Sequence, residues 1–413
     1  RSSQGIDDVE SQLLNRLKDL TGYDLGYFYK PFDRIEIDDK NADLVREIHT
    51  QAVEIVATTW RDDSSTYAWL QQRVVSDEFV FVRHEAVQQI ATGWNQEPGV
   101  LELLKQLVVS HESKIVRAAA VQEIASGWKQ EPGILELLKQ RVVFDEGPLV
   151  RAEAFKQIAT GWKQEPGILE LLKQWVVSDE SNIVRTVAVQ QIASGWKQEP
   201  GILELLKQRV VSDESNYVRA VAVEQIASGW KQEPGNLDLL KQWVVSDESE
   251  NVRAVAVRQI ASGWKQEPGI LELLKQRVES DESELVRGEA LRQIASGWKQ
   301  EPGILELLKQ RVVSDESWHV RAVAVRQIAS GWKQEPGILE LLKQWVVSDE
   351  SEKVRREAVR QIASGWKQEP GILELLKQRV VSDESWQVRD EAVQQIASGW
   401  KQEPGILELL KQW

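Results

Sequence analysis

The dipeptide Gly-Trp recurs every 34 residues through most of this chain, and no other feature constrains its fold as strongly. A fixed period of this length is typical of a solenoid, in which each unit buries its apolar face only against its neighbours. We therefore expect one repeat array rather than the two or three globular domains that 413 residues would otherwise suggest. The repeated tryptophans are Trp94, Trp128, Trp162, Trp196, Trp230, Trp264, Trp298, Trp332, Trp366 and Trp400, with Trp60 one step upstream after Thr59.

Each unit predicts two helices. Pro200 favours the start of the first, because its missing N–H needs no partner at a helix beginning. Ser215 follows a short turn and is expected to cap the second helix, which Gly229 ends. The apolar residues keep helical spacing, with Ile202, Leu203, Leu205, Leu206 and Val210 in the first helix and Val218, Ala222, Val223 and Ile226 in the second.

The composition excludes several classes of function. The net charge of −14 argues against a nucleic-acid or membrane-surface partner, since both require basic surfaces. The chain has no cysteine and only four dispersed histidines, so we expect no metal site and no cofactor. Paired carboxylates recur in nearly every unit, which suits turns better than one active site, and no catalytic residues are expected. No apolar run reaches the ~18 residues needed to cross a bilayer.

The repeat pattern also predicts the domain organisation. Residues 1–42 show no copy of the repeat and are expected to form a capping or linking segment, since a solenoid end must be covered. Residues 43–413 should form the solenoid, with a leading partial unit at 43–63, ten units at about 64–402 and an unpaired final helix at 403–413. Because the chain opens on Arg1 without any methionine and stops mid-pattern at Trp413, we expect a longer parent protein.

The second helix resembles the HEAT repeat, in which an Asp is followed six residues later by the Arg of a Val-Arg pair and then by small and apolar residues. The resemblance covers about residues 43–413 and implies a right-handed all-α superhelix whose Val-Arg helices line a concave face. It also implies an Asp–Arg ladder along the stack. The matching positions include Asp179 with Arg185, Asp213 with Arg219 and Asp247 with Arg253, whereas His111 replaces the Asp before Arg117, and Asp43 is followed by His49.

The Gly-Trp-Lys-Gln-Glu-Pro version of the repeat is similar to repeats at the C-terminal end of cyanobacterial NACHT-type STAND proteins, relatives of NLR sensors. This second resemblance implies a cytoplasmic signalling protein. The chain itself contains no Gly-Lys-Ser/Thr phosphate-binding loop, so an ATPase module could lie only outside it.

The near-identical units differ from one another at five positions of the second helix. Counted from the Val of Val-Arg, these positions are −2, −1, +2, +3 and +6, and we call them the variable positions. On a helical wheel they span an arc from about 160° to 300°, and the near-constant apolar positions lie around 0° to 140°. The exposed positions of the first helix, such as Glu204, Lys207 and Gln208, hardly change. We interpret this confined variation as diversification of a binding surface, although drift of unconstrained positions is the alternative.

The candidate ligand-binding residues combine aromatic anchors with a row of arginines at +6. Glu289 and Glu357 precede Arg292 and Arg360 by three residues and could pair with them. Arg258 and Arg326 lack such a partner, so we expect them to bind an acidic group. The full candidate set is Phe79, Phe81, Asn182, Ile183, Tyr217, Arg258, Arg292, Trp318, His319, Arg326, Arg360 and Trp386.

These features favour a non-enzymatic solenoid that recognises a protein partner on its variable concave face, as the sensing region of a larger bacterial NLR-like protein. One alternative is a scaffold array with no dedicated ligand. Another is a HEAT-like bilin lyase or chaperone, which would need an enclosed pocket. We also expect end-to-end self-association through the apolar face of the final helix, including Ile406, Leu407 and Leu410.

Overall fold

The computed structural model describes residues 39–403 and 405–411, and over these residues the chain is helical and contains no strand. This confirms the all-α prediction. The capping segment predicted at 1–42 falls almost entirely outside the described residues and stays a prediction. The chain divides into two compact units, Arg1–Trp196 and Lys197–Trp413, each of which is described by itself.

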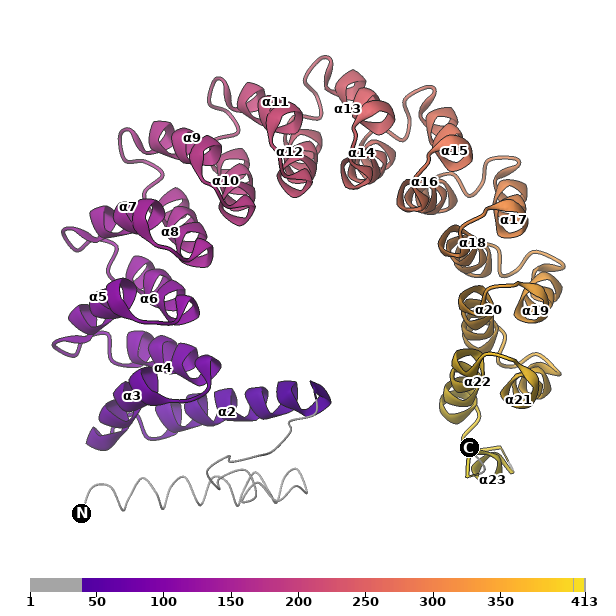
Figure 1. Ribbon diagram of the computed structural model, residues 1–413, viewed down its shortest axis with the longest axis horizontal. Coiled ribbons are helices and arrows are strands. Elements are labelled where there is room, and N and C mark those ends of the chain that lie inside the picture. The colour runs from indigo at the N-terminus through magenta and orange to yellow at the C-terminus, as the bar shows by residue number, and fades with distance from the viewer. Residues whose placement is uncertain (1–38, 404, 412–413) are drawn as a thin grey trace. The chain divides into compact units, whose positions relative to one another are not determined.

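Two-helix repeats follow the long helix α2 (Asp39–Thr59) (Figure 1). The first helices are α3 (Ser64–Ser76), α5 (Val100–Ser110), α7 (Ile134–Phe144), α9 (Ile168–Ser178), α11 (Ile202–Ser212), α13 (Asn236–Ser246), α15 (Ile270–Ser280), α17 (Ile304–Ser314), α19 (Ile338–Ser348) and α21 (Ile372–Ser382). The second helices, here called Val-Arg helices, are α4 (Val80–Gly93), α6 (Lys114–Gly127), α8 (Pro148–Gly161), α10 (Asn182–Gly195), α12 (Asn216–Gly229), α14 (Glu250–Gly263), α16 (Glu284–Gly297), α18 (Trp318–Gly331), α20 (Glu352–Gly365) and α22 (Trp386–Gly399). The short helix α23 (Ile406–Leu410) follows.

From α5 to α21, the first helix of each repeat begins two residues after the proline that was expected to open it. Pro200 does not open α11, because Glu199, Pro200, Gly201 and Ile202 form a β-turn closed by a 3.4 Å hydrogen bond from the Ile202 N–H to the Glu199 carbonyl. Gly201 has φ 80° and ψ −4°, as required at the third position of a type II turn. Pro at the second position and Gly at the third therefore specify a turn, and the helix starts after it.

The turns before most Val-Arg helices are stabilised by an aspartate, and only some of them also have the predicted serine cap. The Ser215 side chain makes no capping bond, and the Ser215 N–H instead donates to the Asp213 carboxylate at 3.0 Å. Ser283, Ser317 and Ser351 do cap their helices through the side chain. The aspartate accepts the same hydrogen bond in both kinds of repeat, so it is the more regular element of the turn.

The core lies between the two helices of a repeat and between neighbouring repeats. Ile202, Val218 and Ile226 are fully buried, and the repeated tryptophans are almost as well covered. In most repeats a lysine of the preceding repeat lies over the tryptophan ring, as Lys129 lies 5.9 Å from the ring centre of Trp162. Trp128 is only half-buried, and the preceding repeat carries Asn95 in place of that lysine.

Within each unit the Val-Arg helices of neighbouring repeats pack against one another. The first helices pack mainly on the Val-Arg helix of their own repeat. Figure 1 shows the resulting two rows of helices, with the even-numbered Val-Arg helices closer together than the odd-numbered first helices. Residues at the same offset in successive Val-Arg helices therefore lie in rows that run along each unit.

The final helix differs in part from the prediction. Ile406 was expected on an exposed apolar face, but it is 1% exposed, and α23 contacts α22. Leu407 is 64% exposed, and the side chain of Leu410 lies outside the described residues. Ile406 thus packs in the core of the last repeat, whereas Leu407 stays exposed, and end-to-end self-association stays a prediction.

Candidate interaction surface

The Arg of each Val-Arg helix joins two successive repeats. Arg253 donates from Nε and Nη2 to the two oxygens of Asp281 in the next repeat, at 3.2 and 3.0 Å. Its Nη1 donates to the main-chain carbonyls of Asp247 and Glu248 in its own repeat. Arg253 and Asp281 are buried, so this charge pair is shielded from water and fully hydrogen-bonded.

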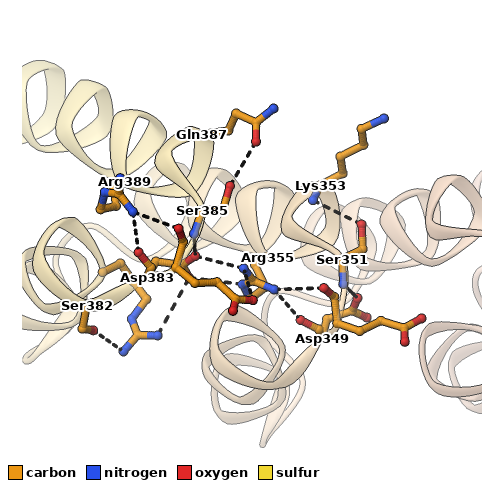
Figure 2. Close-up of polar contacts among 12 residues, drawn as sticks. Asp349, Ser351, Lys353, Arg355, Ser382, Asp383, Ser385, Gln387 and Arg389 are labelled. Atoms are coloured by element: carbon orange, nitrogen blue, oxygen red, sulfur yellow. Dashed lines mark hydrogen bonds and ion pairs between the residues drawn. The ribbon is translucent and has the colours of Figure 1, made fainter.

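The same arrangement recurs along each unit. Figure 2 shows it for Arg355, which binds Asp383 of the next repeat and the turn at Asp349 in its own. Arg219 contacts Asp247 at 3.5 Å, and Arg151 contacts Asp179 at 2.9 Å. Of the other residues predicted for the ladder, Arg185 is buried and donates to the carbonyl of Asp179, and Asp213 is buried and accepts from Ser215.

His111 occupies the position of the ladder aspartate in its repeat. Its Nδ1 accepts a hydrogen bond from the Ser113 N–H at 3.0 Å, as the aspartate oxygen does elsewhere. Its Nε2 lies 3.3 Å from the carbonyl of Val74 and can donate to it. Arg83, which has no aspartate in the next repeat, pairs with Glu112 at 3.3 Å. His111 thus accepts the hydrogen bond of the turn as the aspartate does, but it supplies no carboxylate for the arginine of the preceding repeat.

The arginines predicted to lack a partner are both paired, which corrects the sequence-based expectation. Arg326 donates from Nε and Nη2 to Glu357 of the next repeat at 2.8 and 3.0 Å. Arg258 binds Glu289 of the next repeat at 3.1 Å. The partner lies 31 residues along the chain, at position +3 of the neighbouring Val-Arg helix, and a search limited to one helical turn misses it.

The remaining +6 arginines are also paired with glutamates at position +3. Arg360 binds Glu391 of the next repeat and lies 3.5 Å from Glu357, three residues before it. Arg292 pairs with Glu289 in its own helix. These arginines form a second set of ion pairs along the Val-Arg helices of the second unit. They stabilise the contact between repeats, and their outer edges remain about half exposed.

Burial separates the variable positions into two kinds. Positions +2 and +3 lie between neighbouring Val-Arg helices in several repeats, where Ala322, Val323, Glu289 and Glu357 are all buried. The exposed surface is therefore narrower than the arc of five variable positions that the helical wheel predicted. Positions −2, −1 and +6 supply most of its exposed side chains.

Two carboxyl groups on the Val-Arg helices, those of Glu123 and Glu357, have shifted pKa values. Burial alone would raise the pKa of Glu357, but hydrogen bonds from Arg326 and Gln361 and the nearby arginine charges hold it below its ordinary value. Burial raises the pKa of Glu123, a hydrogen bond with Gln88 opposes this effect, and the charge of Glu85 adds to it. Glu357 is thus stabilised as an anion, and Glu123 is not.

Trp318 and His319 form the most elaborate aromatic cluster of the second unit. The Lys353 ammonium lies 3.9 Å from the centre of a Trp318 ring, and the His319 ring meets Trp318 edge-on at 5.7 Å. A Cβ atom on Gly288 would lie 3.4 Å from the His319 ring, so His319 packs directly against the backbone of α16 at Gly288. Trp318 remains 38% exposed.

The other predicted aromatic and apolar residues differ in exposure. Tyr217 and Trp386 are 65% and 66% exposed, and Ile183 and Phe81 are 43% and 41% exposed. Asn182 is exposed at the start of α10. Phe79 instead packs its ring against His49 of α2, with the ring centres 4.9 Å apart, and contributes to the contact between α2 and α4. Phe79 is therefore better described as a packing residue.

The described residues contain no group of three His, Cys, Asp or Glu side chains that could hold a metal ion. None of the described helices is long and apolar enough to cross a membrane.

Solved structures with a similar course of the chain have low sequence identity. The Escherichia coli protein YibA is 18% identical, with a TM-score of 0.40, covering 66% of this chain and 97% of YibA. Kap95p, solved with RanGDP, is 14% identical with a TM-score of 0.47, covering 90% of this chain and 55% of Kap95p. Kap121p, solved with Nup53p, is 14% identical with a TM-score of 0.41, covering 85% of this chain and 45% of Kap121p. The chain thus spans nearly all of YibA but about half of the two larger proteins.

No curated protein matches the sequence. A sequence profile of HEAT repeats matches residues 101–193, 203–295 and 302–397, which together make up more than half of the chain. The matched ranges contain both the Val-Arg helices and the aspartate turns whose geometry is described above. The chain belongs to the HEAT-repeat family.

Proposed function

We propose that this chain is a protein-recognition solenoid that binds a partner through the exposed variable positions of its Val-Arg helices. The observation that carries the proposal is the exposure of large side chains at −2 and −1. Tyr217 and Trp386 are about two-thirds exposed, although their repeats are otherwise nearly identical to the rest. Exposed aromatic side chains of this kind are typical anchors of protein interfaces.

The first helices provide the contrast. Glu204 and Lys207 form an ion pair within one helix at 3.0 Å, and most other repeats keep the same pair, which gives these two positions a structural reason for constancy. Gln208 is exposed and equally constant among the repeats. If every exposed position drifted freely, this glutamine would differ among the repeats as well. Its constancy supports the view that the variation at the exposed positions of the Val-Arg helices reflects selection for binding.

The cellular role of this binding is part of the proposal. The Gly-Trp-Lys-Gln-Glu-Pro motif supports a role as the ligand-sensing region of a bacterial NLR-like signalling protein that acts in the cytoplasm. In such a protein the solenoid recognises the ligand and another region performs the catalysis. The proposal assigns no enzymatic activity to this chain.

Affinity capture from the source cell tests the proposal. The immobilised chain is compared with a variant in which Tyr217 and Trp386 are both changed to alanine. The matched control changes Val211 and Val313, which are each 78% exposed on first helices, to alanine. We expect the control to retain the captured partner and the Tyr217/Trp386 variant to lose it at unchanged melting temperature. Equal capture by both variants would support the scaffold alternative instead.

A further inference from the structure

The third repeat exposes an additional large apolar side chain where its two helices meet. Phe144, the last residue of α7, is 74% exposed, and it follows Val143, which is 51% exposed as the equivalent valines of most repeats also are. Leu149, the second residue of α8, is 39% exposed. These side chains flank one short turn in the middle of the first unit.

The sequence of this turn departs from every other repeat. Serine occupies the position of Phe144 in all of them: Ser76, Ser110, Ser178, Ser212, Ser246, Ser280, Ser314, Ser348 and Ser382. Gly147 replaces the usual serine before the Val-Arg helix, and a Cβ atom there would lie 3.1 Å from Lys114 and 3.2 Å from Arg117. The turn therefore packs tightly on the preceding repeat, and the exposed phenylalanine is not needed to close it.

Apolar side chains of the neighbouring repeats extend the surface. Ile115 and Ile183 hold the same −1 position as Leu149 at the starts of α6 and α10, and these helices pack against α8 on either side. Packed helices lie ~8–10 Å apart. An α-helix advances ~10.5 Å in seven residues, so one apolar residue per heptad could follow this row.

Acidic side chains border the apolar residues. Glu112, Glu146 and Glu180 lie in the three successive turns, and their side chains are 79%, 88% and 88% exposed. The arginines that approach Glu146 and Glu180 already bind the ladder aspartates of the same turns, Asp145 and Asp179. Lys114 is exposed in this region and Arg141 is half-buried. The exposed charges at this edge are therefore mainly negative.

We propose that Val143, Phe144, Pro148 and Leu149, with Ile115 and Ile183, form a docking site for a basic amphipathic helix of a protein partner, and we call it the repeat-3 patch. Phe144 and Leu149 anchor the apolar face of that helix, and its lysine or arginine residues face the three glutamates. This inference rests on the proposed protein recognition, but it uses other residues than Tyr217 and Trp386, so the two can fail separately.

A synthetic peptide tests the patch directly. The probe is a helix-forming peptide of about 20 residues with leucine on one face and lysine on the other, together with a counterpart carrying glutamate in place of lysine. Binding to the purified chain is measured by fluorescence anisotropy at two salt concentrations. We expect the lysine peptide to bind more tightly at low salt, and Phe144→Ser to weaken this binding at least fivefold, about 1 kcal/mol.

The serine variant is a conservative probe because serine occupies this position in the other repeats, so its melting temperature should match that of the wild type. Leu149→Ser should weaken binding in the same direction. Val211→Ser changes a valine of α11 that is about as exposed as Phe144, and it should leave binding unchanged. Unchanged binding by Phe144→Ser would overturn the proposal, as would equally tight binding of the glutamate peptide. Binding to neutral phosphatidylcholine vesicles that depends on Phe144, in place of peptide binding, would also overturn it.

Discussion

Arg326 and Glu357 face each other across two successive repeats, and two hydrogen bonds of 2.8 and 3.0 Å join the guanidinium to the carboxylate. The carboxylate is buried, and the guanidinium is half exposed. The two residues occupy variable positions, so variation among the repeats also affects how neighbouring repeats hold together. This pair gives variable positions +3 and +6 a structural role in these repeats. The proposed binding role therefore rests on the exposed side chains at the other variable positions.

Removing Arg326 should destabilise the second unit. In Arg326→Gln the buried Glu357 loses its bidentate partner but keeps Arg360 at 3.5 Å. We expect a loss of about 1–2 kcal/mol in the free energy of unfolding, less than for a fully buried pair because Arg326 is half exposed. Urea denaturation at pH 7 measures it.

The pH dependence of this loss follows from the lowered pKa of Glu357. A carboxyl group whose pKa is lower in the folded state contributes stability above its unfolded pKa, ordinarily near 4.5, and loses it as the pH falls through the folded value. The difference between wild type and Arg326→Gln should therefore be full at pH 7 and shrink below about pH 4.5. A difference that grows in acid would contradict this assignment.

The two-helix repeat and the Asp–Arg positions could be predicted because both depend on spacing within one repeat. Pairing of Arg326 with Glu357 could not, because it depends on how two repeats are rotated against each other. A systematic comparison would have found the signal, since Arg258, Arg326 and Arg360 each precede a glutamate by 31 residues. Pro200 is a different case, because the Pro-Gly turn signal outweighs the preference of proline for the first helical position.

Loss of a ladder arginine should be more severe than loss of a +6 arginine. Arg253→Ala removes the bidentate partner of the buried Asp281, which keeps only the Ser283 N–H and the more distant Arg277, and it removes the donor to two main-chain carbonyls. We therefore expect a loss of about 3–5 kcal/mol. Arg258→Ala, in the same helix, leaves Glu289 paired with Arg292 and should cost about 1 kcal/mol or less. Urea denaturation of both variants measures the difference, and hydrogen exchange should localise the greater loss to α14 and α16. Equal losses of stability in the two variants would contradict the structural role assigned to the Asp–Arg ladder.

Glu123→Gln should stabilise the first unit at neutral pH. Every other repeat has glutamine at this position, and burial raises the pKa of Glu123. A group with a raised folded pKa contributes its stability below the unfolded pKa, near 4.5, and loses it as the pH rises through the folded value. The variant should therefore gain about 1 kcal/mol at pH 7 and show no gain near pH 4. Thermal melts at the two pH values measure this, and an equal gain at both would exclude ionisation as the cause.

Gly201 should resist substitution for conformational reasons alone. Its φ is +80°, and a Cβ atom there would meet nothing within 4 Å. Gly201→Ala should therefore cost about 1–2 kcal/mol through backbone strain without a clash. Gly229→Ala is the control, because Gly229 ends α12 without a positive φ and should accept alanine at little or no cost. Chemical denaturation distinguishes the two, and equal stability of both variants would contradict the turn assignment.

The candidate surface was harder to predict than the fold. Variation among repeats identified Tyr217, Trp318 and Trp386 as exposed, because a helical wheel separates core from surface. It could not distinguish solvent from a neighbouring helix, and so it placed the buried Ala322 and Glu289 on the same face. Phe144 lies outside the five variable positions, in the last turn of a first helix, where the other repeats have serine.

The central claim is that exposed variable residues bind a protein partner, and the affinity of that partner for the Tyr217→Ala/Trp386→Ala variant tests it most directly. Isothermal titration calorimetry with the purified partner should show a dissociation constant at least tenfold higher than for the wild type, about 1.4 kcal/mol, at an unchanged melting temperature. The Val211→Ala/Val313→Ala control should bind as the wild type does. An unchanged dissociation constant for the Tyr217/Trp386 variant would contradict the account.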